Sequence, residues 1–245
     1  MISYVRITTY FVILSSTLAS YSTSPTISEQ LHMLVLGSHD ASHKQQLDIR
    51  SALNRAGIEH ADLVPVKQMN DVGPYLAGSR LVSFTADGIW LNEQALADLS
   101  PEEQAFVYQH EAVHYLRNHH AELLIHLTSV SYIATLIIAT SRTLFSSTLL
   151  RTANNLILGY LAATLYIKHI LQPLRIRQEH EADYTATRIL VNSGNSTIVH
   201  HYLAQLDDLI ADGMGTETDG WHETLLQQRA TIATALAAST VHIKQ

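Results

Sequence analysis

The stretch that decides the fold runs from residue 99 to residue 114 and reads Leu-Ser-Pro-Glu-Glu-Gln-Ala-Phe-Val-Tyr-Gln-His-Glu-Ala-Val-His. It carries a strong start signal for a helix. Ser100 can cap the first turn, Pro101 suits the first helical position, and the two glutamates that follow complement the positive end of the helix dipole. We expect this helix to run from Pro101 to about His120. It would place His110 and His114 one turn apart on the same face.

The segment His110-Glu111-Ala112-Val113-His114 has the spacing of a metal site. Imidazoles four positions apart on a helix reach one metal ion, and Glu111 projects beside them, where its carboxylate can take a proton from metal-bound water. Because the chain has 15 histidines, this pattern alone arises by chance in about 4% of comparable sequences. A catalytic zinc also needs a third protein ligand and an open coordination position.

A second motif, Glu179-His180-Glu181-Ala182-Asp183, offers that third ligand. Glu179 and Asp183 lie four positions apart, so on a helix one can bind the metal while the other accepts a hydrogen bond from a ligand histidine. His180 and Glu181 compete as ligands, but their side chains point away from the face that holds Glu179 and Asp183. Ala182 allows two helices to approach closely. The alternative interpretation is a solvated acidic helix start.

The composition excludes several classes of protein. The 245 residues include no cysteine, which rules out a disulfide scaffold, a cysteine nucleophile and a thiolate metal site. The net charge of -7 argues against nucleic acid as a partner, since phosphate binding needs clustered Lys and Arg. Charged residues make up 15% of the chain, below the roughly 25% typical of soluble domains. Part of the chain is therefore expected to avoid water.

Residues 1–28 resemble a targeting segment. A lone cation, Arg6, precedes an uncharged apolar run over 7–19 and a Ser/Thr-rich stretch over 20–28. This pattern predicts a signal peptide or an uncleaved membrane anchor followed by a linker. The rest of the chain, 29–245, is expected to form one domain.

Two uncharged stretches, 123–140 and 152–167, lie between the two metal motifs. We expect helices at about 121–140 and 150–171 that form an inserted membrane hairpin over about 121–171. The alternative is an apolar helix pair that packs on a soluble core or dips into one leaflet.

The remaining pattern predicts a mainly helical α+β chain. Pro173 is expected to end the second hairpin helix, and a new helix should start near Arg177 and stop at Gly194. The other expected elements are strands at 31–37, 80–84 and 88–91, and helices at 41–57, 196–212 and 222–239.

An HExxH motif, a hydrophobic hairpin and an E-x-x-A-D motif, in this order, resemble the HtpX-like and CAAX-prenyl-protease families of membrane zinc metallopeptidases. The resemblance covers about 50–240. It implies a zincin-like core with a small edge sheet and one zinc ion per chain. It further implies that His110, His114 and Glu179 are the zinc ligands, Glu111 is the general base, and Asp183 is the partner of a ligand histidine.

The resemblance extends to substrate binding. The segment from Ser83 to Trp90 resembles the edge strand on which such peptidases hold an extended substrate. Trp221-His222 and Arg229 resemble the family's His-Pro…Arg-Ile element, which helps hold the substrate or the oxyanion. Two features depart from the family's element: Glu223 replaces the proline, and the spacing from His222 to Arg229 is one residue longer. The other histidines are expected to be ordinary residues: His119 and His120 end the active-site helix, where imidazoles suit the negative end of its dipole, and the rest lie on the surface or in the core.

These observations predict a zinc-dependent endopeptidase that hydrolyses peptide bonds in membrane-associated or misfolded proteins. One alternative is an inactive zinc-binding relative that acts as a chaperone or adaptor, and another is a membrane protein with a coincidental motif. The expected partners are protein substrates and membrane lipid, with no nucleic acid. The expected location is a membrane, the bacterial inner membrane. If the N-terminal segment inserts with Arg6 in the cytoplasm, the active site lies outside the cytoplasm, whereas the cations that flank the hairpin favour the cytoplasmic side. The sequence leaves the oligomeric state open.

Overall fold

The computed structural model describes residues 38–69, 82–85, 88–92, 96–144, 146–213 and 225–243. It has two compact units, one formed by Glu29–His120 with Arg175–Gln245 and the other by Met1–Ser28 with Ala121–Leu174. Three features named in the sequence analysis lie outside the described residues: the signal peptide or anchor over 1–28, the strand over 31–37, and His222.

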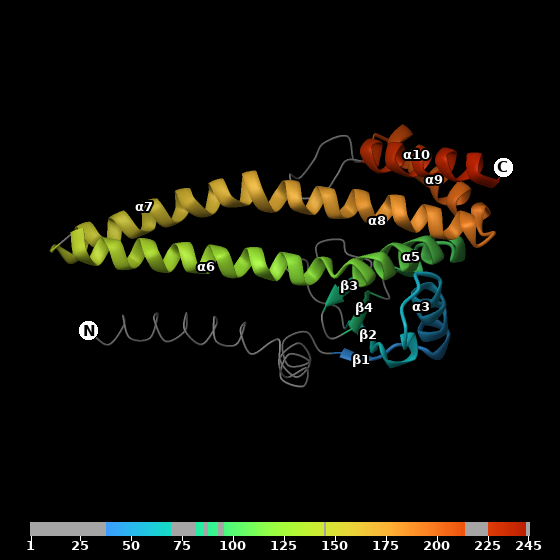
Figure 1. Ribbon diagram of the computed structural model, residues 1–245, viewed down its shortest axis with the longest axis horizontal. Coiled ribbons are helices and arrows are strands. Elements are labelled where there is room, and N and C mark those ends of the chain that lie inside the picture. The colour runs from blue at the N-terminus through green and yellow to red at the C-terminus, as the bar shows by residue number, and fades with distance from the viewer. Residues whose placement is uncertain are drawn as a thin grey trace. The chain divides into compact units, whose positions relative to one another are not determined.

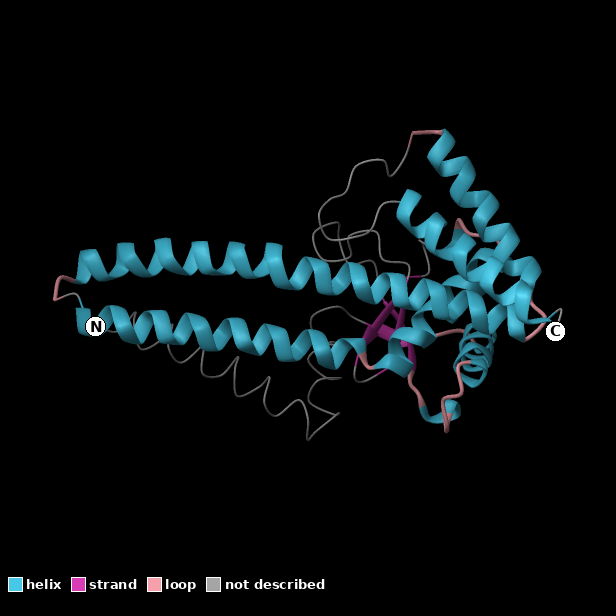
Figure 2. Ribbon diagram, turned by 45° about the horizontal axis from the view of Figure 1, so that its top comes forward, coloured by secondary structure: helices cyan, strands magenta, loops and turns pink. Residues whose placement is uncertain are grey.

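A small four-stranded sheet lies in the first unit (magenta in Figure 2). Its order is β1-β2-β4-β3, and β2 pairs in parallel with β4 while the other pairs are antiparallel. Strands β3 and β4 agree with the sequence prediction within two residues, but β2 was not predicted, because four residues next to a proline show too little alternation to indicate a strand. The strands are β1 (Ser38–Asp40), β2 (Val66–Met69), β3 (Val82–Thr85) and β4 (Gly88–Asn92).

Gly88 is required where β4 enters the sheet. Its φ is 146°, and a Cβ at this position would lie 2.4 Å from the carbonyl oxygen of Pro65. The next residue, Ile89, donates its N–H to the same oxygen at 2.9 Å. Only glycine allows the two chain segments to approach this closely.

Two helices with capping boxes pack on each other in this unit: α3 (His43–Arg55) and α5 (Pro101–Arg117). In α5, Ser100 Oγ accepts the N–H of Glu103 at 3.2 Å, and the N–H of Ser100 donates to the Glu103 carboxylate at 2.6 Å. The predicted start of this helix is confirmed. Its end is earlier than the predicted His120, because Asn118 takes a left-handed conformation with φ 54° and caps the helix.

Helix α5 lies at the centre of the unit and contacts three groups of neighbours. Tyr108 and Ala112 belong to a buried cluster with α3 and the sheet, whereas Phe106 belongs to a cluster with α8, α9 and α10. Val113 packs on α8. These C-terminal helices are α8 (Gln172–Asn192), α9 (Ser196–Ala211) and α10 (Leu225–Ile243), and α9 contacts α10 (orange to red in Figure 1).

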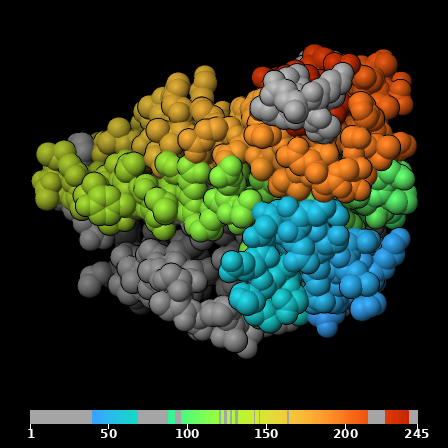
Figure 3. Space-filling view, turned by 45° about the vertical axis from the view of Figure 1, so that its right-hand side comes forward, coloured from blue at the N-terminus to red at the C-terminus, as the bar shows by residue number. Residues whose placement is uncertain are grey.

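On the surface, α3 and the segment after it form one continuous face (blue to cyan in Figure 3).

The second unit contains α6 (His119–Leu144) and α7 (Thr148–Tyr166). Polar contacts join the two helices. Asn154 donates to Ser141 Oγ at 2.7 Å, and His126 Nδ1 lies 2.9 Å from the Tyr166 hydroxyl. These residues interrupt both apolar stretches with polar side chains. Among the described residues, no helix combines the length and apolar character needed to cross a membrane. The predicted transmembrane helices are therefore not supported.

The predicted helix break at Pro173 is wrong. A π-helix over Ile167–Leu171 follows α7, and α8 begins at Gln172 directly after it. A proline ring clashes with the carbonyl four residues earlier in a regular α-helix. The wider π turn directly before Pro173 changes the hydrogen-bond register, which lets the helix continue.

Candidate metal centre

Close packing of α5 on α8 brings the two sequence motifs together. Val113, Ala182 and Ala186 form a fully buried cluster between these helices. Two of its three members are alanines, and these small side chains leave room for the side chains one turn earlier on each helix to meet. The predicted role of Ala182 in helix approach agrees with this packing.

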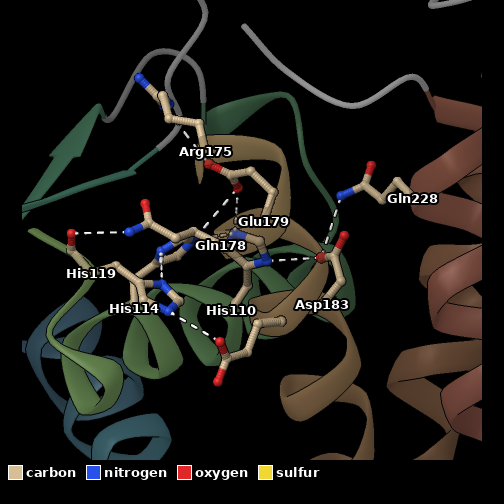
Figure 4. A network of polar contacts seen from close by, with 9 residues as sticks. His110, His114, His119, Arg175, Gln178, Glu179, Asp183 and Gln228 are labelled. Atoms are coloured by element: carbon tan, nitrogen blue, oxygen red, sulfur yellow. Dashed lines mark hydrogen bonds and ion pairs between the residues drawn. The ribbon is translucent and has the colours of Figure 1, made fainter. Parts of the chain in front are cut away.

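His110, His114 and Glu179 present their metal-binding atoms to one another (Figure 4). His110 Nε2 lies 2.9 Å from His114 Nε2 and 3.2 Å from Glu179 Oε2, and His114 Nε2 lies 3.5 Å from the same Glu179 oxygen. A tetrahedral zinc ion with ligand bonds of about 2.0–2.1 Å holds neighbouring ligand atoms about 3.3 Å apart. The donor set and its spacing therefore fit zinc.

Asp183 orients one of the two histidines. Its Oδ1 lies 2.8 Å from His110 Nδ1 and accepts a 3.4 Å hydrogen bond from Gln228 of α10 (Figure 4). The carboxylate is fully buried. It therefore favours the tautomer with hydrogen on Nδ1, which leaves the His110 Nε2 lone pair directed at Glu179 and His114.

The charges at this site favour a bound cation. Burial lowers the pKa of His110, but the Asp183 and Glu179 carboxylates more than offset it, and the net pKa lies well above the usual value. Burial raises the pKa of Glu179, but hydrogen bonds and attraction from His110 and His114 hold it far below its usual range. Two carboxylates, those of Glu179 and Asp183, thus lie beside the histidines. A metal cation can compensate their charge once His110 has released its proton.

A comparison with protein-family models bears on this geometry. The model of peptidase family M48 matches residues 44–224, which include both metal motifs. The chain belongs to peptidase family M48. The M48 family consists of zinc-dependent metallopeptidases, so this chain is a metallopeptidase, and its mainly helical fold with a small sheet is consistent with that assignment. Comparisons with curated proteins and with solved structures give no match.

Glu111, the predicted general base of this M48 chain, lies on α5 directly after His110. Its side chain is partly buried. The competing ligands of the second motif have other partners. His180 Nδ1 contacts Thr231 Oγ1 at 2.6 Å, and Glu181 accepts from Arg117 at 2.9 Å. Neither belongs to the three-residue group that could hold a metal.

Arg229 forms an ion pair with Asp207 that joins α10 to α9 in the M48 chain. Both side chains are substantially exposed. The proposed role of Arg229 at the substrate or oxyanion stays a prediction.

The sequence analysis missed one residue that contacts the candidate metal centre. His119, interpreted as an ordinary histidine, is buried with its Nδ1 2.8 Å from the Nδ1 of His114 (Figure 4). A signal was present in Asn118, because asparagine adopts the left-handed conformation more readily than most residues and often ends a helix.

Proposed function

We propose that this M48 chain is a zinc-dependent endopeptidase with one zinc ion per chain, held by His110, His114 and Glu179. The observation that carries the proposal is the triangle of ligand atoms on α5 and α8, with separations of 2.9, 3.2 and 3.5 Å. Family membership supports the same conclusion.

Each residue of the site has a chemical task in this proposal. Bound zinc supplies a Lewis acid that lowers the pKa of water and polarises the scissile carbonyl. Glu111 accepts the proton of the attacking water and delivers it to the leaving amine. Asp183 keeps His110 in the tautomer that leaves Nε2 available. His222 and Arg229 stay predicted contributors to substrate or oxyanion binding.

Strand β3 offers a place for the substrate backbone. It lies at one end of the sheet order, and among the described strands it pairs with β4 alone. An extended peptide can add to such an edge through main-chain hydrogen bonds. This binding mode suits segments without stable structure, which supports misfolded or membrane-associated proteins as substrates.

We also propose a membrane location, with the pair α6–α7 in contact with lipid. Most of the exposed large apolar side chains of the described residues lie on these two helices. They include Tyr132 and Leu144 on α6 and Leu149, Leu156 and Tyr160 on α7, all at least 66% exposed. Apolar surface of this extent commonly marks a contact with lipid or another protein.

Two isosteric substitutions test the catalytic proposal. Glu111→Gln removes the base but no ligand, so we expect it to bind zinc as the wild type does and to lose at least about 100-fold in cleavage rate. Glu179→Gln removes an anionic ligand, so we expect zinc to be lost. The measurements are zinc per chain by elemental analysis and cleavage of an unfolded casein substrate in detergent.

The outcomes separate the alternatives. Cleavage retained by Glu111→Gln would refute its role as base. If the wild type binds zinc but neither it nor Glu111→Gln cleaves the substrate, the result would favour the inactive chaperone or adaptor. A folded wild type without zinc would refute the metal site.

A further inference from the structure

His119 contacts a predicted zinc ligand from outside the zinc triangle. The rings of His114 and His119 meet edge to face with centroids 4.9 Å apart, and their Nδ1 atoms are 2.8 Å apart. His114 directs its other nitrogen, Nε2, at His110 and Glu179. Each nitrogen of His114 thus has a separate task, one toward the metal position and one toward His119.

A left-handed turn at Asn118 allows the contact between His119 and His114. In an uninterrupted helix, residues five positions apart point about 140° away from each other, so His119 could not face His114. Asn118 breaks the helix with its left-handed conformation, and its N–H still bonds to the carbonyls of His114 and Tyr115. A left-handed residue other than glycine is uncommon and is retained where the surrounding structure requires it.

Neighbouring residues hold His119 in place. Its carbonyl accepts a hydrogen bond from the Gln178 amide at 3.3 Å. Its Nε2 lies 3.7 Å from Glu181 Oε2, and the other oxygen of Glu181 accepts from Arg117 at 2.9 Å. The ring is therefore set between a metal ligand and a carboxylate.

The hydrogen positions follow from these contacts. A His114 that binds zinc through Nε2 carries its hydrogen on Nδ1. That N–H then donates to His119 Nδ1, which must be unprotonated, and His119 carries its hydrogen on Nε2, toward Glu181. Glu181, weighed above as a competing ligand, thus faces the nitrogen of His119 that bears the hydrogen.

We infer that His119 is a positioning residue, which orients His114 for zinc by accepting the hydrogen bond of its Nδ1–H. The two histidine ligands therefore have different partners, a carboxylate for His110 and a neutral imidazole for His114. This inference rests on the proposed zinc site but not on catalysis.

Two nearly isosteric variants test it. In His119→Asn the amide oxygen can occupy the position of Nδ1 and accept the same hydrogen bond, whereas His119→Leu has the same branching without an acceptor. The full-length proteins are titrated with zinc against a chelator, and the visible spectrum of the cobalt-substituted form reports ligand geometry. His201→Gln, at an exposed histidine of α9, is the control.

We expect His119→Leu to bind zinc about 10- to 100-fold more weakly and to shift the cobalt spectrum. His119→Asn should stay within about threefold of the wild type, as should the control. Unchanged affinity and spectrum in His119→Leu, or equal losses in the Leu and Asn variants, would overturn the inference alone. A wild type that binds no zinc would overturn the inference and the proposed function together.

Discussion

Tyr108 lies in the core between α3 and α5 with a buried hydroxyl that has no hydrogen-bond partner among the described residues. Burial, and to a lesser extent the charge of Asp48, raise its pKa to about 12. The phenol of an unfolded chain titrates near pH 10. Protonated Tyr108 therefore contributes fully to the free energy of unfolding below about pH 10, and this contribution is lost as the pH rises toward about 12.

We predict that Tyr108→Phe leaves the free energy of unfolding at pH 7 unchanged or raises it by up to about 1 kcal/mol, because an unpaired buried hydroxyl is removed. The variant should also lose less stability between pH 9 and 12 than the wild type does. Urea unfolding at a series of pH values measures both effects. A loss of more than about 1 kcal/mol at pH 7 would show that the hydroxyl has a partner.

At the same scale, the structure brings together three residues that the sequence analysis named. His110, His114 and Glu179 form a group that could hold a metal ion, and Asp183 contacts His110. Their role as zinc ligands stays a prediction. The partner of His114 could not be predicted, because it depends on the backbone turn at Asn118 and not on a repeat of side chains.

At the scale of the elements, the junction of α5 and α6 has a left-handed residue that is not glycine. Asn118 is exposed and left-handed, a conformation that costs a residue with a Cβ about 1–2 kcal/mol and glycine almost nothing. We predict that Asn118→Ala lowers the free energy of unfolding by about 1 kcal/mol, whereas Asn118→Gly changes it little.

Because the turn also places His119, Asn118→Ala should weaken zinc binding more than Asn118→Gly does. Urea unfolding of the metal-free proteins and zinc titration measure the two effects separately. Equal behaviour of the alanine and glycine variants would show that the left-handed turn is not required.

At the scale of the whole molecule, α6 and α7 carry most of the exposed large apolar side chains of the described residues. Leu156 and Tyr160 lie one turn apart on α7 and are 69% and 72% exposed. We predict that the full-length protein floats with phospholipid vesicles in a density gradient, and that changing both residues to lysine reduces the floating fraction several-fold, because charge disfavours contact with the apolar membrane interior.

The matched control changes Leu63 and Leu226 to lysine, since these exposed leucines, at 71% and 50%, belong to the other unit. It should float like the wild type. A wild type that stays at the bottom of the gradient, or equal losses in both double variants, would contradict a lipid contact through α7.

The sequence by itself determined the features that depend on neighbours along the chain. The cap at Ser100, the spacing of His110 and His114 and the pair Glu179 and Asp183 all follow from helix geometry within one or two turns. Family membership follows from the same motifs.

Tertiary structure decided what depends on distant segments. Strand β2 exists because β1 and β4 flank it, and Glu179 reaches the histidines, which lie 65 to 69 positions earlier, because small residues let α8 pack on α5. His119 reaches His114 because Asn118 ends α5 in a left-handed conformation and Gln178 of α8 donates a hydrogen bond to the His119 carbonyl. Such contacts depend on packing between segments, which local periodicity does not encode.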